Sequence, residues 1–146
     1  MALPTTPSQT VGPYYSIGLS RRRENELAPG GKPLHGHLVD GEGQPVDGMI
    51  ELWDAFGRRW GRSGTDADGR FDFVVPEDAE VLEVYVFARG LLKHQRTRVY
   101  LPGAKDDVLE SLPEDERATL VAEDVNGVLR FDVRLQGERQ TVFFAV

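Results

Sequence analysis

The sequence has no cysteine among its 146 residues, which excludes disulfides, thiolate nucleophiles and thiolate metal ligands. It also has no long apolar run, because no segment approaches the roughly 20 residues that a membrane-spanning helix needs. Positive charge is in deficit, with 17 Lys and Arg against 24 Asp and Glu, and the net charge of -7 disfavours nucleic acid as the main partner. An anionic small substrate stays open, since local arginines can set a local positive potential.

Two further absences bear on location and on chemistry. The first residues, MALPTTPSQTVGPYY, lack the basic and apolar regions of a secretory signal peptide, so we expect a cytoplasmic protein. The run GRRWGRSG lacks the lysine and the following helix of a phosphate-binding loop. What remains is one globular domain, long enough to bury a core without cross-links.

Short apolar segments separated by turns rich in Gly, Asp and Pro dominate the chain from Leu34 onward. This spacing is typical of an all-β protein, an antiparallel β-sandwich. In VLEVYVFA the residues Leu82, Val84, Val86 and Ala88 share one wholly apolar face, which should meet the core. A short strand is expected between AFGRR and TDADG, and the other strands are predicted at Leu34–Val39, Met49–Asp54, Arg70–Val75, Val81–Ala88, Gln95–Leu101, Leu129–Leu135 and Thr141–Val146.

One segment departs from the strand pattern. Residues 111–122, SLPEDERATLVA, predict one short helix with Ser111 as its N-cap and Pro113 in its first turn. We expect this helix against an edge or end of the sandwich.

Residues 1–33 differ from the rest of the chain and carry five of its nine prolines. Their pattern is neither helical nor alternating, and adjacent aromatics such as Tyr14 and Tyr15 are rare in solvated tails. We therefore predict an extended N-terminal arm over residues 1–33 that packs on the surface or on a neighbouring chain, followed by a sandwich domain over residues 34–146.

Two motifs could hold a metal ion. His35 and His37 form H-x-H, which on a strand puts both rings on one face, but no third ligand is evident. The more ordinary interpretation is a pair of histidines on the outer face of a strand. Asp66-Ala67-Asp68-Gly69 resembles the start of a calcium loop, but its glycine is misplaced, so a hairpin turn is favoured.

Arg89 directly follows an apolar strand and precedes Gly90. A strand end of this kind can present a guanidinium group to a carboxylate. An exposed loop arginine is the alternative.

Four segments spread over nearly the whole chain form a recognisable set: TPSQTVGPYYSIGL (6–19), GHLVDGEGQPVDGMIELWDAFGRRW (36–60), VFARGLLKHQRTRVYL (86–101) and RFDVRLQGERQTVFFAV (130–146). Together, and in this order, they resemble the intradiol ring-cleavage dioxygenases. This resemblance implies a β-sandwich whose catalytic ferric ion sits in a sister β chain, held by two tyrosines and an H-x-H pair.

The chain departs from the family at the positions of the iron ligands. Val81 and Glu83 stand at the two histidine positions, Trp60 stands at the first tyrosine position, and the loop for the second tyrosine is essentially absent around residues 75–80. The resemblance therefore implies a non-catalytic α-type subunit that binds no cofactor itself. It also implies a hetero-oligomer with an Fe(III)-bearing β chain.

In this family the α chain completes the substrate pocket of its partner. The resemblance assigns that role to Thr10, Gly12, Pro13 and Tyr14 in the arm and to Arg89 at the strand end. Gly12 would allow close approach of a backbone, Pro13 would stiffen the wall, and Arg89 would hold the carboxylate of a small aromatic substrate at the interface.

Two other classes of function stay open. The turn pattern VDGEGQPV…TDADGRF also occurs in transthyretin-like domains, so a sandwich binding or interaction module without enzymatic role is the main alternative. A homo-oligomeric enzyme with a metal at His35 and His37 is the other.

Overall fold

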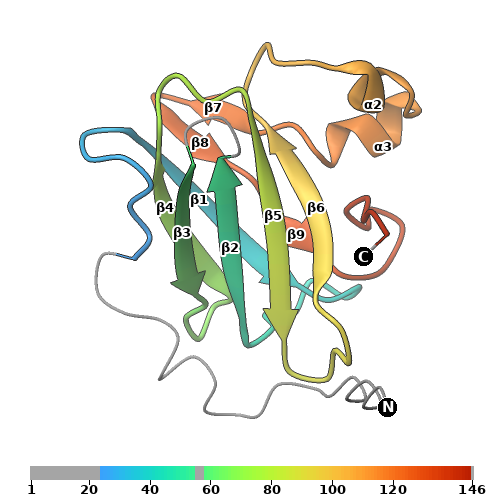
Figure 1. The fold of residues 1–146 in the computed structure, drawn as a ribbon. Coiled ribbons are helices and arrows are strands. Elements are labelled where there is room, and N and C mark those ends of the chain that lie inside the picture. Colours follow the sequence, from blue (N-terminus) through green and yellow to red (C-terminus); the bar gives the residue numbers. More distant parts are fainter. Residues whose placement is uncertain (1–23, 55–57, 146) are drawn as a thin grey trace, which may run out of the picture.

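The computed structural model describes residues 24–54 and 58–145, and it confirms the predicted β-sandwich. Two sheets pack face to face, with two short helices at one end (Figure 1). The first sheet has the order β3-β2-β5-β6, and the second has the order β4-β1-β8-β7 with β9 also beside β1. The elements are β1 Lys32–Val39, β2 Gly48–Asp54, β3 Arg59–Gly64, β4 Arg70–Val75, β5 Val81–Ala88, β6 Gln95–Tyr100, α2 Asp107–Glu110, α3 Glu114–Ala118, β7 Glu123–Val125, β8 Val128–Arg130 and β9 Val133–Arg134.

The core lies between the two sheets and is made by alternate residues of each strand. The predicted inward face of β5 is confirmed, since Leu82, Val84, Val86 and Ala88 are each at most 1% exposed. Phe71 and Phe73 of β4 meet them from the opposite sheet in the same apolar cluster. Because side chains alternate along a strand, the outward residues of β5 are fixed by the same packing.

The second sheet is mixed, because β1 runs parallel to both β8 and β9. The single strand predicted over Leu129–Leu135 is wrong, since it is broken at Phe131 and Asp132. There the carboxylate of Asp132, instead of a backbone carbonyl, accepts the N–H of His37 at 2.9 Å. Gly36 faces this break, and a side chain on it would overlap the carbonyl oxygen of Phe131.

The strand predicted over Thr141–Val146 is also absent from the described residues, where only Phe144 forms an isolated bridge with Arg96. Threonine hydroxyls hold this segment instead. The hydroxyl of Thr97 donates to the carbonyl of Val142 at 2.6 Å, and Thr141 accepts the N–H of Arg134 at 2.9 Å. The closing segment therefore lies beside β6 without becoming a strand of the sheet.

The helical region differs from the prediction in the number of helices, two instead of one, and in the N-cap residue. Within the predicted stretch the structure has α3, whose N-cap position is occupied by Pro113 and not by Ser111. A second helix, α2, was not predicted, and its N-cap is Asp106, whose carboxylate accepts the N–H of Leu109. Ser111 ends α2, and Pro113 stands immediately before α3. No helix in the described part of the chain is long and apolar enough to cross a membrane.

The turn at Asp66 is tight, but it does not make a hairpin. The Asp66 carboxylate accepts the N–H groups of Asp68 and Arg70, both at 2.9 Å, and Gly69 has a positive φ of 76°. The prediction of a hairpin is wrong because the turn joins β3 to β4, which belong to different sheets.

Residues 24–27 fasten the two sheets together along one side of the sandwich, and we call this segment the edge clip. The carbonyl of Glu24 accepts the N–H of Arg62 on β3 at 2.8 Å. The carbonyl of Asn25 accepts the N–H of Val74 on β4 at 3.0 Å, and Leu27 donates to the Val74 carbonyl at 2.9 Å. Leu27 is 6% exposed and belongs to the core, so the clip is anchored by burial as well as by hydrogen bonds.

Replacing Leu27 by alanine tests this anchor. Leu27→Ala should lower the free energy of unfolding by about 2–4 kcal/mol, because it removes buried methyl groups and leaves a cavity. Urea unfolding followed by circular dichroism measures this change. Leu92→Ala is the matched control, since Leu92 is 67% exposed and should change stability by less than about 0.5 kcal/mol. Equal effects of the two substitutions would show that the clip does not support the fold.

Candidate functional site

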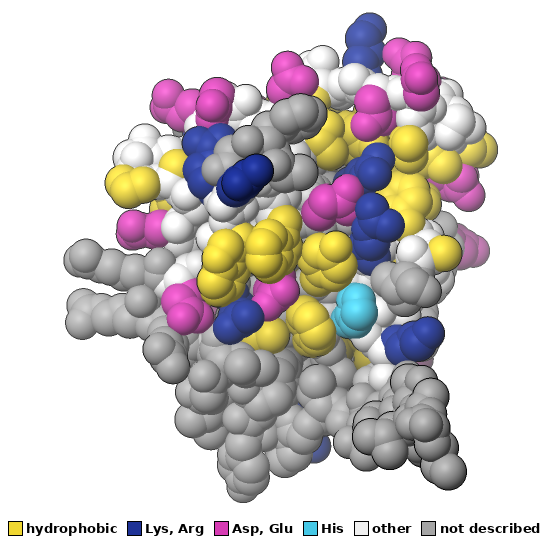
Figure 2. All heavy atoms as spheres, in the orientation of Figure 1, with side chains coloured by type: hydrophobic (Ala, Val, Ile, Leu, Met, Phe, Trp, Pro, Cys, Tyr) yellow, Lys and Arg dark blue, Asp and Glu magenta, His cyan; other side chains and the backbone are white. Residues whose placement is uncertain are grey.

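The three positions that the family resemblance matches to iron ligands lie on the outer face of the four-stranded sheet. Trp60 projects from β3, while Val81 and Glu83 project from β5 with one residue between them. Trp53 of β2 pairs with Trp60 on one side and with Glu83 on the other, so these side chains form a row across three strands. Hydrophobic side chains gather there, with charged groups beside them (Figure 2). We call this surface the aromatic face, made by Glu51, Trp53, Trp60, Arg62, Glu83, Tyr85 and Phe87.

Two stacked indoles are the most exposed part of the aromatic face. The rings of Trp53 and Trp60 have centroids 5.6 Å apart and planes 18° apart, and the residues are 41% and 40% exposed. The guanidinium group of Arg62 lies 5.0 Å from the centroid of Trp60, a cation–π distance. An indole offers an N–H donor and no acceptor, so Trp60 cannot replace a phenolate ligand.

Glu83 is held by two arginines of the neighbouring strand β6. Its Oε2 accepts from Nε of Arg96 at 3.1 Å, and its Oε1 accepts from Nε of Arg98 at 2.9 Å. Both carboxylate oxygens are thus engaged in charge-assisted hydrogen bonds. Because Val81 has no donor atom and Trp60 offers no lone pair, these three positions do not fit a ferric ion. The described residues contain no group of three or more His, Asp or Glu that could hold a metal.

One end of the outer face is covered by the helical region. Tyr100 lies opposite Val81 in the β5–β6 pair, is fully buried, and packs with Leu109 and Leu120. Its hydroxyl donates to the carboxylate of Asp106 at 3.0 Å. Burial raises the pKa of Tyr100, and this hydrogen bond adds to the shift against an opposing effect of Arg98.

His35 and His37 lie on the outer face of β1, as the more ordinary interpretation of H-x-H predicted, and both are half-buried. Their surroundings differ, because Nδ1 of His35 is 2.8 Å from the guanidinium of Arg70, whereas Nδ1 of His37 is 3.5 Å from Asp132. The guanidinium group beside Nδ1 of His35 disfavours a metal cation at that nitrogen. The pair also belongs to the other sheet, so it does not join the aromatic face.

The pocket residues named from the resemblance fall in two places. Thr10, Gly12, Pro13 and Tyr14 lie outside the described residues. Arg89 is exposed in the turn after β5, and its N–H donates to the carbonyl of Asp47 at 3.2 Å.

Arg89 and Glu83 lie at opposite ends of β5. Arg89 follows Glu83 by six residues, a separation of about 20 Å along an extended strand. Within this chain Arg89 is thus not brought to the positions aligned with the iron ligands.

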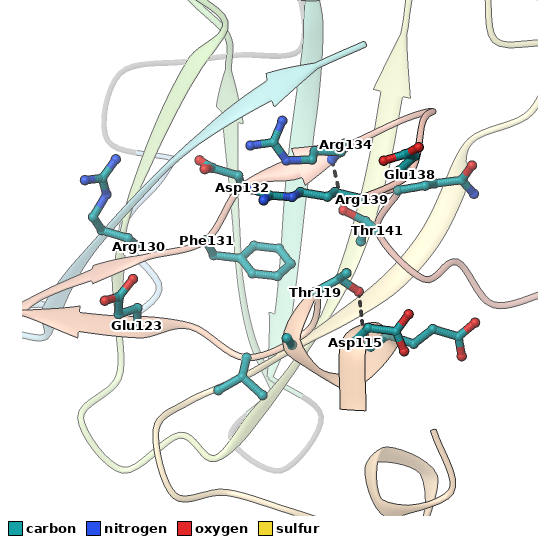
Figure 3. Close-up of a pocket in the computed structure, with 14 residues that line it drawn as sticks. Asp115, Thr119, Glu123, Arg130, Phe131, Asp132, Arg134, Glu138, Arg139 and Thr141 are labelled. Atoms are coloured by element: carbon teal, nitrogen blue, oxygen red, sulfur yellow. Dashed lines mark hydrogen bonds between the residues drawn. The ribbon is translucent and has the colours of Figure 1, made fainter. Parts of the chain in front are cut away.

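A cleft of about 670 Å³ lies between the closing segment and α3, and the sequence analysis missed it (Figure 3). Arg130, Arg134 and Arg139 line it, and the buried Phe131 contributes to its wall. The available signal was the separation of Arg130 and Arg134 by four residues, which would place both on one face of the strand predicted there. Five acidic side chains share the lining and outnumber the arginines, so the cleft has no positive excess to select an anion: Asp115, Glu116, Glu123, Asp132 and Glu138.

Comparison with known proteins gives two curated relatives of nearly full length. The chain is 36% identical to the protocatechuate 3,4-dioxygenase alpha chain of Burkholderia cepacia over an alignment of 194 positions, which covers 99% of this chain and 98% of the relative. It is also 36% identical to the alpha chain of the same enzyme from Pseudomonas putida, covering 97% and 96%. The alignments are longer than the chain, so both relatives contain segments that this chain lacks.

Among solved structures, the chain resembles the dioxygenase domain of a dioxygenase–carbohydrate-binding fusion from Streptomyces sp. SirexAA-E. The TM-score is 0.52 at 22% identity, covering 92% of this chain and 99% of that one, and this likeness shows the fold. No protein-family model matches the chain.

The raised pKa of Tyr100 predicts a pH dependence that a Tyr100→Phe variant should remove. A phenol that holds its proton more tightly in the folded state contributes full stability below the unfolded pKa, about 10, and loses it as pH rises toward the folded pKa. The stability difference between wild type and Tyr100→Phe should therefore be constant up to about pH 9 and shift against the wild type as the pH rises above about 10. Urea unfolding of both proteins at each pH measures it, and a difference independent of pH would contradict the burial of the phenol.

Proposed function

The chain belongs to the alpha chains of protocatechuate 3,4-dioxygenase, and from that premise we propose that it completes the substrate pocket of a homologous, iron-bearing beta chain. It is a non-catalytic subunit of an intradiol dioxygenase, an oxidoreductase. The assembled enzyme would cleave protocatechuate with O2 between its two hydroxyl-bearing carbons, giving 3-carboxymuconate.

The observation that carries the proposal is the replacement of donor atoms on the aromatic face. The family resemblance matches Trp60, Val81 and Glu83 to iron-ligand positions, and the side chains seen there supply neither the phenolate nor the imidazole donors that such a site needs. Two arginines hold the carboxylate of Glu83 at 3.1 and 2.9 Å. We therefore propose that this chain binds no catalytic iron. The partner's ferric ion would activate the bound catecholate for attack by oxygen.

The part played by this chain would be to bind, to orient and to exclude water. Arg89 would hold the substrate carboxylate, because a guanidinium group suits a planar carboxylate with two parallel hydrogen bonds. The arm would contribute Thr10, Gly12, Pro13 and Tyr14 as one wall of the pocket. Such a wall removes water from around the reacting groups, which strengthens every electrostatic interaction inside.

The predicted sandwich binding module is not favoured. Both curated relatives are alpha chains of an enzyme, and their matches include the N-terminal arm and the closing segment, which a plain module does not need. The cytoplasmic location stays a prediction.

The lone chain should be colourless after exposure to ferric salts and should retain far less than one iron per chain. Its residues lack the tyrosinate donors whose charge transfer to iron gives intradiol enzymes their colour. Visible absorption and metal analysis check this, and a red chain with stoichiometric iron would contradict the proposal. His37→Ala serves as a second arm, because metal retention that depends on His37 would favour a site at the H-x-H pair instead.

In the assembled enzyme, Arg89→Ala should raise KM for protocatechuate by about 10-fold or more and leave the iron content unchanged. The reason is the loss of a charge-assisted contact to the substrate carboxylate, which is worth about 1.5–3 kcal/mol. Steady-state kinetics with iron analysis measures both quantities. Lys93→Ala, an exposed cation in the same turn, is the matched control and should change KM little. Equal kinetics of the two variants would remove Arg89 from the pocket.

A further inference from the structure

We propose that Asn126 is a site of spontaneous deamidation, and that the carboxylate of Asp124 restrains the reaction by holding the attacking nitrogen of Gly127. The proposal is independent of the function proposed above. It concerns the turn between β7 and β8, in which Asn126 and Gly127 join the paired residues Val125 and Val128. This turn lies at the edge of the second sheet, away from the aromatic face.

Deamidation of an asparagine that precedes glycine is an intramolecular substitution. The backbone nitrogen of Gly127 attacks Cγ of Asn126 and gives up its proton to a solvent base. A bond from this nitrogen to Cγ forms, the bond from Cγ to the side-chain nitrogen breaks, and ammonia leaves. Water then opens the resulting succinimide ring at either carbonyl, which leaves aspartate or isoaspartate at position 126. The reaction needs no reagent other than water.

The chain has two asparagines, and their surroundings differ. Asn126 is exposed and is followed by Gly127, which has no Cβ to crowd the attacking nitrogen. Asn25 is followed by Glu26, and its side-chain amide donates to the carbonyl and the carboxylate of Asp72 at 3.1 and 2.9 Å. Asn25 therefore serves as an internal reference within the same molecule.

The backbone of the turn explains why the reactive dipeptide is there. Asn126 has a φ of 54° and Gly127 has a φ of 87°. Positive φ at both residues of a two-residue hairpin loop defines a type I′ turn, for which Asn-Gly is preferred. Asparagine and glycine reach this left-handed region at lower cost than other residues. The dipeptide that closes the hairpin is thus also the one most open to deamidation.

Asp124 holds the nucleophile of this reaction. Its Oδ1 accepts the N–H of Gly127 at 2.8 Å, and its Oδ2 accepts from Nζ of Lys32 at 2.7 Å. The hydrogen bond from Lys32, and after it the one from Gly127, lowers the pKa of Asp124, so the carboxylate stays charged at neutral pH. An N–H bonded to a carboxylate is withheld from a solvent base. The amide anion that attack requires would also be repelled by the adjacent negative charge.

Deamidation would alter the edge of the sheet and leave its centre in place. Isoaspartate puts an extra methylene group into the backbone of a two-residue loop, which then no longer fits the turn that pairs Val125 with Val128. Strand β8 stays attached, because β1 pairs with it and Leu129 is fully buried. We therefore expect the modification to loosen β7 and to add a negative charge beside Asp124.

The test follows the reaction at both asparagines of the full-length chain, folded at mildly alkaline pH and unfolded in guanidinium chloride. Peptide mapping by mass spectrometry measures the conversion, and it separates position 126 from aspartate–glycine pairs such as Asp68-Gly69, which form the same ring. Asp124→Ala removes the restraint. Glu123→Ala is the matched control, because it removes a negative charge from the same strand and leaves the Asp124 carboxylate in place.

We expect Asp124→Ala to raise the rate at Asn126 in the folded chain about 10-fold or more, as fits the loss of a hydrogen bond to a charged group, and Glu123→Ala to change it less than about two-fold. In guanidinium chloride the wild type and both variants should react at one rate, faster than the folded wild type. Asn25 should react more slowly than Asn126 throughout. Equal rates of folded wild type and folded Asp124→Ala would overturn the proposal, and so would a wild-type rate that unfolding leaves unchanged.

Two further variants keep the test decisive if Asp124→Ala does not fold, which circular dichroism establishes. Lys32→Ala frees the Asp124 carboxylate from one partner and should raise the rate at Asn126 about two- to five-fold, and an unchanged rate would overturn the proposal. Asn126→Gly keeps a residue that suits the type I′ turn but has no side-chain amide. The acidic form that isoelectric focusing detects in aged wild type should be absent from this variant, and its persistence would show that Asn126 is not the site.

Discussion

The alternation of side chains along β5 is the constraint on which the aromatic face depends. Leu82, Val84 and Val86 are fully buried between the sheets, which forces Val81, Glu83 and Tyr85 outward. A slip of one residue would exchange the two sets and would bury a glutamate, so the register is strongly specified. The core therefore determines which side chains stand at the positions aligned with iron ligands, whatever those side chains are. A relative can change the chemistry of this face without disturbing the packing beneath it.

The aromatic face has been rebuilt around ion pairs and stacking where the family resemblance implies a metal. A ferric ion would need several anionic donors around it. Here the charge of Glu83 is instead balanced by ion pairs with Arg96 and Arg98. Arg98 stands on β6 directly opposite Glu83, and Arg96 stands two residues away, opposite Tyr85. The two adjacent strands therefore supply both arginines without any loop. The stacked Trp53 and Trp60 fill the adjoining space across β2 and β3. Both features keep the outer face stable without a bound ion, because the carboxylate of Glu83 is paired with arginines and the two indoles pack on each other.

Local patterns predicted the strand bounds well where one face of the strand is buried. They predicted them poorly where contacts with residues distant in the sequence determine where a strand ends. β4 and β5 have the bounds that alternation predicts. The break between β8 and β9 was not predictable, because the acceptor for His37 is the side chain of Asp132, 95 residues away. The cap at Ser111 failed for a different reason. Ser111 is the C-cap of α2, a helix that was not predicted. The N-cap of that helix is Asp106, whose carboxylate also accepts the hydroxyl of Tyr100, a tertiary contact with no signature in the local sequence.

In the candidate site too, the sequence located individual residues but not the residues that contact them from other strands. The resemblance located Trp60, Val81 and Glu83, and the structure brings them onto one face, but the arginine clamp required knowledge of the β5–β6 register. The arm is linked to this face through the edge clip, since Leu27 is buried in the core while Glu24 is bonded to the strand that carries Trp60. Core packing at Leu27 thus fixes the position of residues 24–27 beside β3, the strand that carries Trp60.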